Sequence, residues 1–550
     1  MKYFIAIFTL FLSVFTLAQN PDLNKIDAIV ASQIGENDPG LFVGIVKDGK
    51  IIYEKYRGLA SLQLQVKIDE KSRSNIASVA KQFTALMILH LSLEEKLSLE
   101  DDIRKYLPNL YPTIKEKIKI RHLLNHTSGI RDYVDLMSIQ RKPWWRQEGL
   151  DNDDVIQLLE KQEELAFNPG TRYMYSNSGY TVLTKIITKV SGASFHDYSK
   201  KFFEDLGMKN TAFLKNYMHV IPGQALPYSD WGDGVWQQYP MMTNLYGDGF
   251  LFTTLKDQLL FEQAVQNAKH NNNVLLIESQ KAIPNSEITT YGFGLELEDR
   301  LNYNAVHHSG GTGSYHAQVV RYPTENLTVY VMSTNSTVWS GSIADQVADF
   351  FLPKKKNQEK YDARINQNSG LIKPEQVVGQ YVSPGEYLIR IIKEKGKLYW
   401  KNGNNNPIEI VHEKDNIYSI KRNPKIKIGF YETELVYFYP SGNASTYKKI
   451  PVSKPTLSDL ESYEGEYFSS ELDVTFSLQL NETKKLMISR SDWKKSHEVE
   501  VLNRNELLVF DYILKIQRDK FNRVTNILLT TNRVLNNRFV KKKLKISTQD

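Results

Sequence analysis

The sequence predicts an α/β domain, with an antiparallel sheet flanked by helices and an added helical lobe, followed by two small all-β barrel domains. Both ends of residues 22–352 have sequence patterns typical of strands, and the middle of this segment has patterns typical of helices. Strands far apart in sequence with helices between them indicate one sheet assembled from distant segments. After residue 353 the composition changes to short alternating strands and polar turns, which is typical of small β domains.

The elements of the first domain follow in chain order from the hydrophobic pattern. An Asp48-Gly49 turn separates two apolar strands, which is a strong hairpin signal. Near the end of the domain, residues 323–326 form a turn between two further strands. We predict helices over residues 23–34 and 342–351 and strands over 41–46, 51–54, 317–322 and 327–332. A functional site is then expected in the cleft between the sheet and the helical lobe.

The C-terminal part contains a weak internal repeat. The polar residues 353–373 predict a linker. Residues 379–383 then read Gly-Gln-Tyr-Val-Ser, and residues 465–469 read Gly-Glu-Tyr-Phe-Ser. Because each copy contains many short strands, the repeat predicts two small barrels, over residues 374–452 and 455–546. Neither barrel carries a catalytic pattern of residues.

Length and composition exclude several classes of protein. The 550-residue chain is too long for one core, and its 41% hydrophobic and 24% charged residues are ordinary for a globular protein. The net charge of +6 is small and lies partly in lysines after residue 540, which indicates a solvated end and no nucleic-acid partner. The absence of cysteine excludes disulfides, thiolate metal ligands and a lipid-modified cysteine.

The N-terminus has the pattern of a secretory signal peptide. Met1-Lys2 precedes an apolar stretch that ends at Leu17, and the small Ala18 stands before polar residues. We predict cleavage after Ala18, so that residues 1–18 are removed and the mature protein is periplasmic or secreted without stable membrane insertion. An uncleaved membrane anchor is the alternative, although no other segment approaches roughly 18 unbroken apolar residues.

Ser78 and Lys81 form the first candidate catalytic pair. They open an apolar run long enough to be a buried helix, and residues three apart are neighbours on a helix surface. A serine hydroxyl becomes a good nucleophile when a nearby base takes its proton, and a partly desolvated lysine can be that base. The same Ser-x-x-Lys spacing recurs at Ser445 and Ser491, in strand-like stretches where the two side chains point to opposite faces.

Two further motifs follow the first in a specific order. Tyr175-Ser176-Asn177 comes next, and His308-Ser309-Gly310 comes last. Four further segments are distinctive. They are His-Leu-Leu-Asn-His-Thr-Ser-Gly-Ile at 122–130, Phe-Asn-Pro-Gly-Thr-Arg-Tyr at 167–173, and glycine-containing runs at 247–254 and 291–294. Over about residues 23–351 the sequence resembles the serine β-lactamase and penicillin-recognising peptidase superfamily, specifically the class C-like branch that includes esterases and D-aminopeptidases.

The resemblance implies a β-lactamase/transpeptidase-like fold and a role for each motif residue. Ser78 would form an acyl-enzyme, while Lys81 and Tyr175 would share the proton transfers. The backbone amides of Ser78 and Gly311 would hold the oxyanion, and Asn177 would bind Lys81 and a substrate amide. His308 and Gly310 would lie on the strand beside the substrate. The two barrels resemble those that follow the catalytic domain in D-aminopeptidases and the lipocalin-like domains of other exported members.

The third motif departs from that of β-lactamases, which carry Lys-Thr-Gly at this place. A neutral His308 attracts a carboxylate less than a lysine does, and a histidine ordinarily changes charge near physiological pH. We therefore expect esters or uncharged amides to be better substrates than lactams. His307, His308 and His316 do not predict a metal site, because adjacent strand residues face opposite ways and no carboxylate with ligand spacing is evident.

Several functions remain open at this point. The favoured one is an exported serine hydrolase that acts on esters or on small D-amino-acid amides or peptides, with a small molecule or peptide as its only predicted partner and no cofactor. A weak β-lactamase or a penicillin-binding DD-peptidase is the alternative within the same chemistry. A non-catalytic binding or regulatory protein is the alternative from another class. The intact set of Ser78, Lys81 and Tyr175 favours an enzyme.

Overall fold

The computed structural model describes residues 23–353 and 372–542, except 384–387, 403–405, 432, 440–443 and 452–454. The predicted signal peptide and nearly all of the predicted linker lie outside the described residues. Among the helices of the described part, none is both long enough and apolar enough to cross a membrane.

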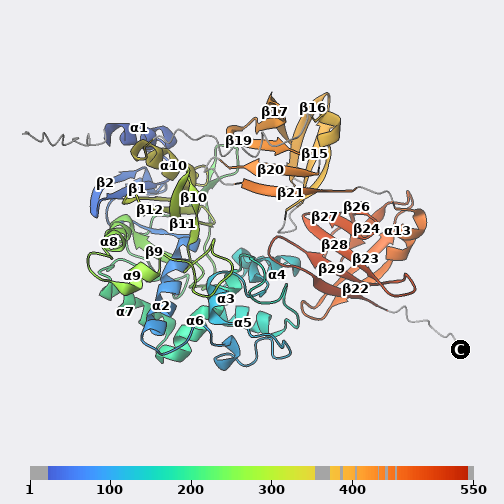
Figure 1. Ribbon diagram of the computed structural model, residues 1–550, viewed down its shortest axis with the longest axis horizontal. Coiled ribbons are helices and arrows are strands. Elements are labelled where there is room, and N and C mark those ends of the chain that lie inside the picture. Colours follow the sequence, from blue (N-terminus) through green and yellow to red (C-terminus); the bar gives the residue numbers. More distant parts are fainter. Residues whose placement is uncertain are drawn as a thin grey trace, which may run out of the picture.

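A six-stranded antiparallel sheet forms the centre of the first domain, in the order β10-β11-β12-β13-β1-β2 (Figure 1). The N-terminal hairpin joins strands from the end of the domain, with Val43 opposite Val331. This pairing confirms the prediction of one sheet built from distant segments. The strands are β1 (Leu41–Lys47), β2 (Lys50–Arg57), β10 (Glu296–Arg300), β11 (Tyr303–Thr312), β12 (Tyr315–Tyr322) and β13 (Leu327–Ser333).

Both faces of the sheet are covered, as the apolar sequence of β1 requires. Leu41, Val43 and Ile45 pack with α1 (Leu23–Gln33) and α10 (Ser340–Phe351), whereas Phe42 belongs to the core shared with the helical lobe. The lobe contains α2 (Lys81–Leu93), α3 (Ile120–Leu124), α4 (Tyr133–Ile139), α5 (Asn152–Glu160), α6 (Asn177–Ser191), α7 (Phe195–Asp205), α8 (Leu255–Gln266) and α9 (Val274–Glu278). A short sheet joins β5 (Arg73–Asn75), β9 (Leu251–Thr254) and β6 (Ala212–Phe213).

The two C-terminal domains are β-barrels, as predicted. The first is a closed barrel of β14 (Gly379–Val382), β15 (Leu388–Glu394), β16 (Lys397–Asn402), β17 (Ile408–Lys414), β18 (Ile417–Ile420), β19 (Asn423–Phe430), β20 (Glu434–Phe438) and β21 (Ala444–Ile450). The second is a nearly closed nine-stranded sheet of β22 (Gly465–Ser469), β23 (Val474–Leu480), β24 (Leu486–Ser489), β25 (His497–Glu498), β26 (Glu500–Asn503), β27 (Glu506–Val509), β28 (Tyr512–Arg518), β29 (Val524–Thr530) and β30 (Asn537–Lys541).

The internal repeat has a structural explanation in the tyrosine that the two copies share. A short helix precedes each barrel, α12 (Pro374–Val377) and α13 (Leu457–Tyr463). Tyr381 donates a hydrogen bond of 2.8 Å to the Val377 carbonyl, and Tyr467 donates one of 2.7 Å to the Tyr463 carbonyl. Each buried phenol therefore ties the first strand of its barrel to the helix before it, which satisfies a polar group inside an apolar core.

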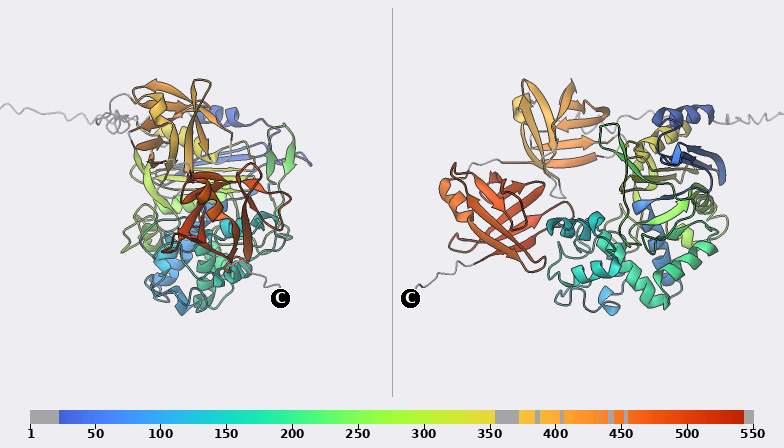
Figure 2. Two further views of the ribbon diagram at one scale, coloured as in Figure 1. Left: turned by 90° about the vertical axis from the view of Figure 1, so that its right-hand side faces the viewer. Right: turned by 180° about the vertical axis from the view of Figure 1, so that it is seen from behind.

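The second barrel packs against the helical lobe beside α4, where it is drawn in red in Figures 1 and 2. Its apolar core is continuous with that of the lobe. The first barrel meets the second through a small apolar cluster in which Leu388 packs with Leu502, Leu508 and Ile513. The second barrel is thus held close to the first domain.

Candidate active site

Ser78 lies at the start of the buried helix, where its backbone is held in a tight turn. The 3₁₀ turn at Ala77–Ala80 leads into α2, and Ala77 has a left-handed φ of 46°. The Asn75 side chain stabilises this conformation by accepting a 2.8 Å hydrogen bond from the Ala77 backbone N–H. The turn exposes part of Ser78 to a cavity of about 440 Å³. Backbone strain of this kind is common where a side chain must be aimed at a ligand.

Lys81 is completely buried beside Ser78. Its Nζ lies 3.1 Å from Ser78 Oγ, 2.8 Å from Asn177 Oδ1 and 2.6 Å from the Asp248 carbonyl oxygen. A buried amine needs such partners, since desolvation without them is costly. The three acceptors fix the amine next to the hydroxyl, so the structure brings together Ser78, Lys81 and Asn177 from the first two motifs.

Tyr175 precedes α6 and lies over the same amine. Its ring centre is 5.0 Å from Lys81 Nζ and 4.3 Å from the His126 ring centre. His126 accepts a 3.1 Å hydrogen bond from the Ser176 backbone N–H. Burial and the nearby charge of Lys81 lower the pKa of His126 well below its usual range, so this histidine is neutral. It therefore acts as a packing and hydrogen-bonding support for Tyr175.

The third motif lies on β11, against the turn that carries Ser78. A Cβ on Gly310 would come within 2.3 Å of the Ile76 carbonyl oxygen and 3.0 Å of the Ser78 nitrogen. The strand approaches the turn this closely because Gly310 has no side chain. Gly311 lines the cavity together with Ser78. All three motifs therefore converge on one cavity.

His308 is buried in this cavity wall and differs from the sequence-based expectation. Its Nε2 lies 2.9 Å from the Tyr291 hydroxyl, and its Nδ1 lies 2.6 Å from the Ser309 carbonyl oxygen. Burial and the charge of Lys81 lower the pKa of His308 to about 3. The expectation that its charge changes near physiological pH is therefore wrong, because the ring stays neutral.

Asp132 is a buried carboxylate that the sequence analysis did not single out. Its Oδ2 accepts hydrogen bonds from both the backbone and the side chain of Asn177, at 2.7 and 3.0 Å. Burial raises the pKa of Asp132 to about 6. Asp132 follows the 122–130 segment almost directly, but nothing in that pattern indicates a contact with Asn177.

Two more carboxylates line the cavity, Asp248 and Glu296. Burial raises the pKa of both. Glu296 lies on β10 directly opposite His307, with 3.5 Å between Oε2 and Nδ1, and Glu298 Oε1 lies 3.5 Å from Nε2 of the same ring. The inference that no carboxylate lies near His307 is therefore wrong. One ligand atom from each of Glu296, Glu298 and His307 lies within 4.8 Å of the other two, so these three side chains could hold a metal ion; the absence of a metal stays a prediction.

Arg533 enters the cavity from the second barrel. Its guanidinium carbon lies 4.9 Å from the centre of the Tyr175 ring. Neither barrel has a catalytic pattern in its sequence, and a single arginine in a loop does not by itself indicate a functional site. Its position depends on how the barrel packs against the first domain.

A buried amine hydrogen-bonded to a cavity-facing serine, beside a tyrosine and an asparagine, defines the class of the protein as a serine hydrolase. The family model described as Beta-lactamase matches residues 26–348, and the chain belongs to this family.

Similar proteins include a penicillin-binding protein and D-aminopeptidases. Penicillin-binding protein 4* of Bacillus subtilis (strain 168) is 29% identical over 308 residues, which are 52% of this chain and 66% of that protein. A D-aminopeptidase of Cereibacter sphaeroides (strain KD131) is 22% identical over 448 residues, 80% of this chain and 81% of that protein. A D-aminopeptidase of Brucella ovis is 27% identical over 321 residues, 57% and 60% of the two chains. The chain thus spans less than two thirds of the length of the first and third of these relatives.

Solved structures share the fold at low sequence identity. The octameric penicillin-binding protein homologue from Pyrococcus abyssi matches with a TM-score of 0.56 and 22% identity, over 78% of this chain and 100% of that one. A D-amino acid amidase from Ochrobactrum anthropi SV3 matches with a TM-score of 0.51 and 21% identity, over 60% and 98% of the two chains. These likenesses agree with the β-lactamase-like domain described above.

Proposed function

We propose that the protein is an exported serine hydrolase that forms an acyl-enzyme at Ser78 and cleaves small D-amino-acid amides or peptides. One observation carries the chemical part of this proposal, the 3.1 Å contact between the buried Lys81 Nζ and Ser78 Oγ. Export is supported by the signal-peptide pattern at residues 1–18.

The reaction follows from the positions of these groups. Ser78 Oγ bonds to the substrate carbonyl carbon while its proton passes to the Lys81–Tyr175 pair. Backbone N–H groups of Ser78 and Gly311 would stabilise the oxyanion that forms. The C–N bond then breaks, and the leaving nitrogen takes the proton from the same pair. Water next bonds to the acyl carbon and gives its proton to the pair, and Ser78 Oγ leaves with that proton.

The charges in the cavity favour an amino-acid substrate over a simple ester. Asp248 and Glu296 both line the cavity, and a bound ammonium group would favour their ionised forms. A free α-amino group supplies such an ammonium, whereas an alkyl ester does not. The D configuration is proposed from the D-aminopeptidases among the relatives. Esters with the same acyl groups are expected to react by the same steps.

A substrate panel tests this proposal. We expect D-alanine p-nitroanilide to be cleaved faster than L-alanine p-nitroanilide, p-nitrophenyl butyrate or a chromogenic cephalosporin without an amino group. Ser78→Ala should abolish turnover of all four, while Ser445→Ala, which changes the same Ser-x-x-Lys spacing on a strand, serves as the matched control. Equal rates on the D- and L-anilides, or no cleavage of either, would contradict the proposed substrate class.

A further inference from the structure

The loop between β29 and β30 of the second barrel is fixed on the start of α4 by backbone contacts. The Arg533 carbonyl accepts a 3.1 Å hydrogen bond from the Asp132 backbone N–H, and the Arg533 backbone N–H donates to Asp135 Oδ2 at 3.2 Å. Thr531 Oγ1 donates to the same oxygen of Asp135 at 2.5 Å. The backbone of Arg533 is therefore held on both sides at the rim of the cavity.

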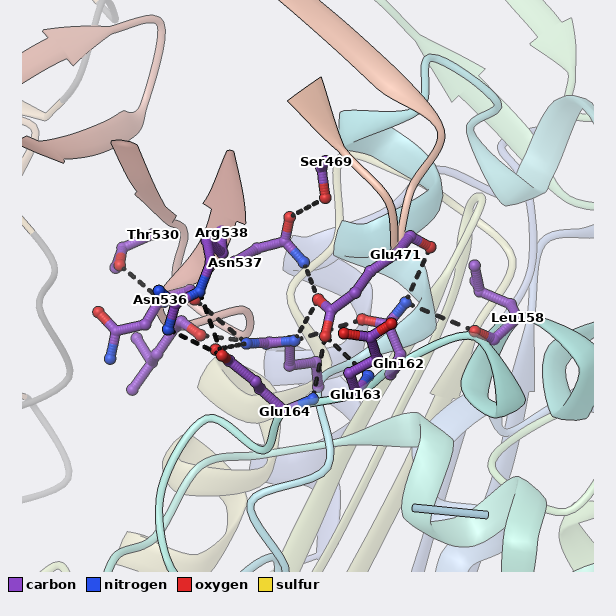
Figure 3. Close-up of polar contacts among 12 residues, drawn as sticks. Leu158, Gln162, Glu163, Glu164, Ser469, Glu471, Thr530, Asn536, Asn537 and Arg538 are labelled. Atoms are coloured by element: carbon purple, nitrogen blue, oxygen red, sulfur yellow. Dashed lines mark hydrogen bonds and ion pairs between the residues drawn. The ribbon is translucent and has the colours of Figure 1, made fainter. Parts of the chain in front are cut away.

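A buried ion pair between Arg131 and Glu471 holds the rest of this interface, and Figure 3 shows the polar contacts around Glu471. Arg131 of the first domain and Glu471 of the second barrel are 0% and 6% exposed, and Arg131 Nη1 lies 2.7 Å from Glu471 Oε2. Glu471 also accepts hydrogen bonds from the backbone of Glu163 and Glu164 and from the Asn537 side chain. Both carboxylate oxygens of Glu471 thus accept hydrogen bonds. Because a buried ion pair is stable only while such contacts are kept, the barrel is docked in a defined orientation.

The guanidinium of Arg533 keeps unused hydrogen-bonding capacity. Its nearest carboxylate contact is a 3.9 Å approach of Nη1 to Asp132 Oδ2, which is too long for a hydrogen bond. Within the part of the chain that the structure describes, no side-chain hydrogen bond of Arg533 is present, and the side chain is 34% exposed. An arginine has several N–H donors in a planar fork that fits a carboxylate. Those of Arg533 are available to a ligand in the cavity.

Arg533 lies beside Tyr175, which places its guanidinium on the leaving-group side of a bound substrate. In the proposed reaction the Lys81–Tyr175 pair protonates the leaving nitrogen, so the ring of Tyr175 lies near the leaving group. The guanidinium carbon is 4.9 Å from the centre of that ring. The other basic groups near the cavity do not compete for an anion there: the Lys81 amine is occupied by three acceptors, and His308 is neutral.

We infer that Arg533 is a specificity-determining residue that binds a carboxylate on the leaving group, so that peptides with a free C-terminal carboxylate on the departing residue are preferred. This inference rests on the proposed function, because it uses the leaving-group side of the same site. It reverses the expectation that uncharged substrates are favoured, since the cation that β11 lacks is supplied by the second barrel. It also gives that barrel a role in substrate selection.

The inference is tested with two matched substrate pairs. In the first pair, D-alanyl-D-alanine is compared with D-alanyl-D-alaninamide, which differ in the terminal carboxylate alone. In the second pair, 3-carboxy-4-nitrophenyl acetate is compared with 4-nitrophenyl acetate, which places the carboxylate on a leaving phenol. The readout is the ratio of kcat/KM values within each pair. Thermal unfolding of each variant verifies that it is folded.

Arg533→Gln should lower the carboxylate preference by roughly ten- to a hundredfold, the range for loss of a charge-assisted hydrogen bond. Arg533→Lys should retain much of the preference, because it keeps the positive charge. Arg538→Gln is the matched control, since Arg538 lies in the same barrel and pairs with Glu164 across the same interface at 2.8 Å. We expect this control to keep the wild-type preference.

The outcomes separate the inference from the proposed function. If wild type cleaves the esters but neither dipeptide, the proposed peptide substrates are wrong, and the ester pair still measures the role of Arg533. If Arg533→Gln leaves the preference unchanged in every pair that is cleaved, or lowers both members of a pair equally, the inference is overturned. If Arg533→Gln lowers kcat/KM for both members of a pair equally, Arg533 acts through Tyr175 instead of through the substrate.

Discussion

Gly310→Ala tests the close approach between β11 and the turn that carries Ser78. An added Cβ would lie 2.3 Å from the Ile76 carbonyl oxygen, whereas ordinary contacts begin at 3.4 Å. The strand or the turn must therefore move by about 1 Å, and the obstacle is backbone, which yields less easily than a flexible side chain. A misplacement of about 1 Å between reacting groups costs roughly a hundredfold in rate. We expect kcat/KM to fall by about that factor.

The neighbouring glycine supplies the comparison for this experiment. A Cβ on Gly311 would meet its nearest atom, Nδ1 of His316, at 3.7 Å, which is ordinary van der Waals contact. Gly311→Ala keeps its backbone N–H, so its loss should be much smaller than that of Gly310→Ala. The assay is kcat/KM on the best substrate of the panel, with thermal unfolding measured in parallel. A folded Gly310→Ala enzyme within threefold of wild type would refute the reasoning.

Three further predictions concern groups around the cavity and in the interface with the second barrel. Lys81→Ala and Tyr175→Phe should each lower turnover by roughly two to four orders of magnitude, and the double variant should lose far less than the product of both effects if the two act as one unit. Asp132 has its pKa raised by burial from 3.8 to about 6, so its contribution to stability is full below pH 3.8 and is lost as the pH rises through 6. Activity should instead fall below about pH 6, because the Asp132 carboxylate that accepts hydrogen bonds from Asn177 becomes protonated. Asp132→Asn should remove the pH dependence of activity in pH–rate profiles and that of stability in thermal unfolding profiles. Glu471→Gln leaves the charge of Arg131 buried without its partner, which should destabilise the docked barrel by about 3–5 kcal/mol, seen as a lower unfolding temperature and faster proteolysis between the domains; an unchanged profile would contradict this role.

The parts of the molecule that follow from local pattern were predicted correctly. The start and buried character of the helix after Ser78 follow from its apolar run, and the contact between Ser78 and Lys81 follows from their spacing on that turn. One sheet assembled from distant segments was predicted from the strands at both ends of the domain, whereas the particular pairing of β1 with β13 is seen only in the structure. The second barrel was visible through the repeated tyrosine at positions 381 and 467.

The parts that depend on packing between distant segments were not predicted. Glu296 was missed because β10 reads as a charged stretch, and an edge strand of this kind has little apolar periodicity. The charge state of His308 follows from its burial, which no residue near it in sequence indicates. Arg533 lies in an ordinary loop of the second barrel, and only the docking of that barrel brings it to Tyr175.

Covalent labelling tests the central claim, that Ser78 is the nucleophile activated by Lys81, most directly. A fluorophosphonate probe is incubated with the protein, and the modified peptide is identified by mass spectrometry. We predict one labelled residue, Ser78, with labelling lost in Ser78→Ala and strongly slowed in Lys81→Ala. A label that persists in Ser78→Ala, or that maps to Ser445 or Ser491, would contradict the account.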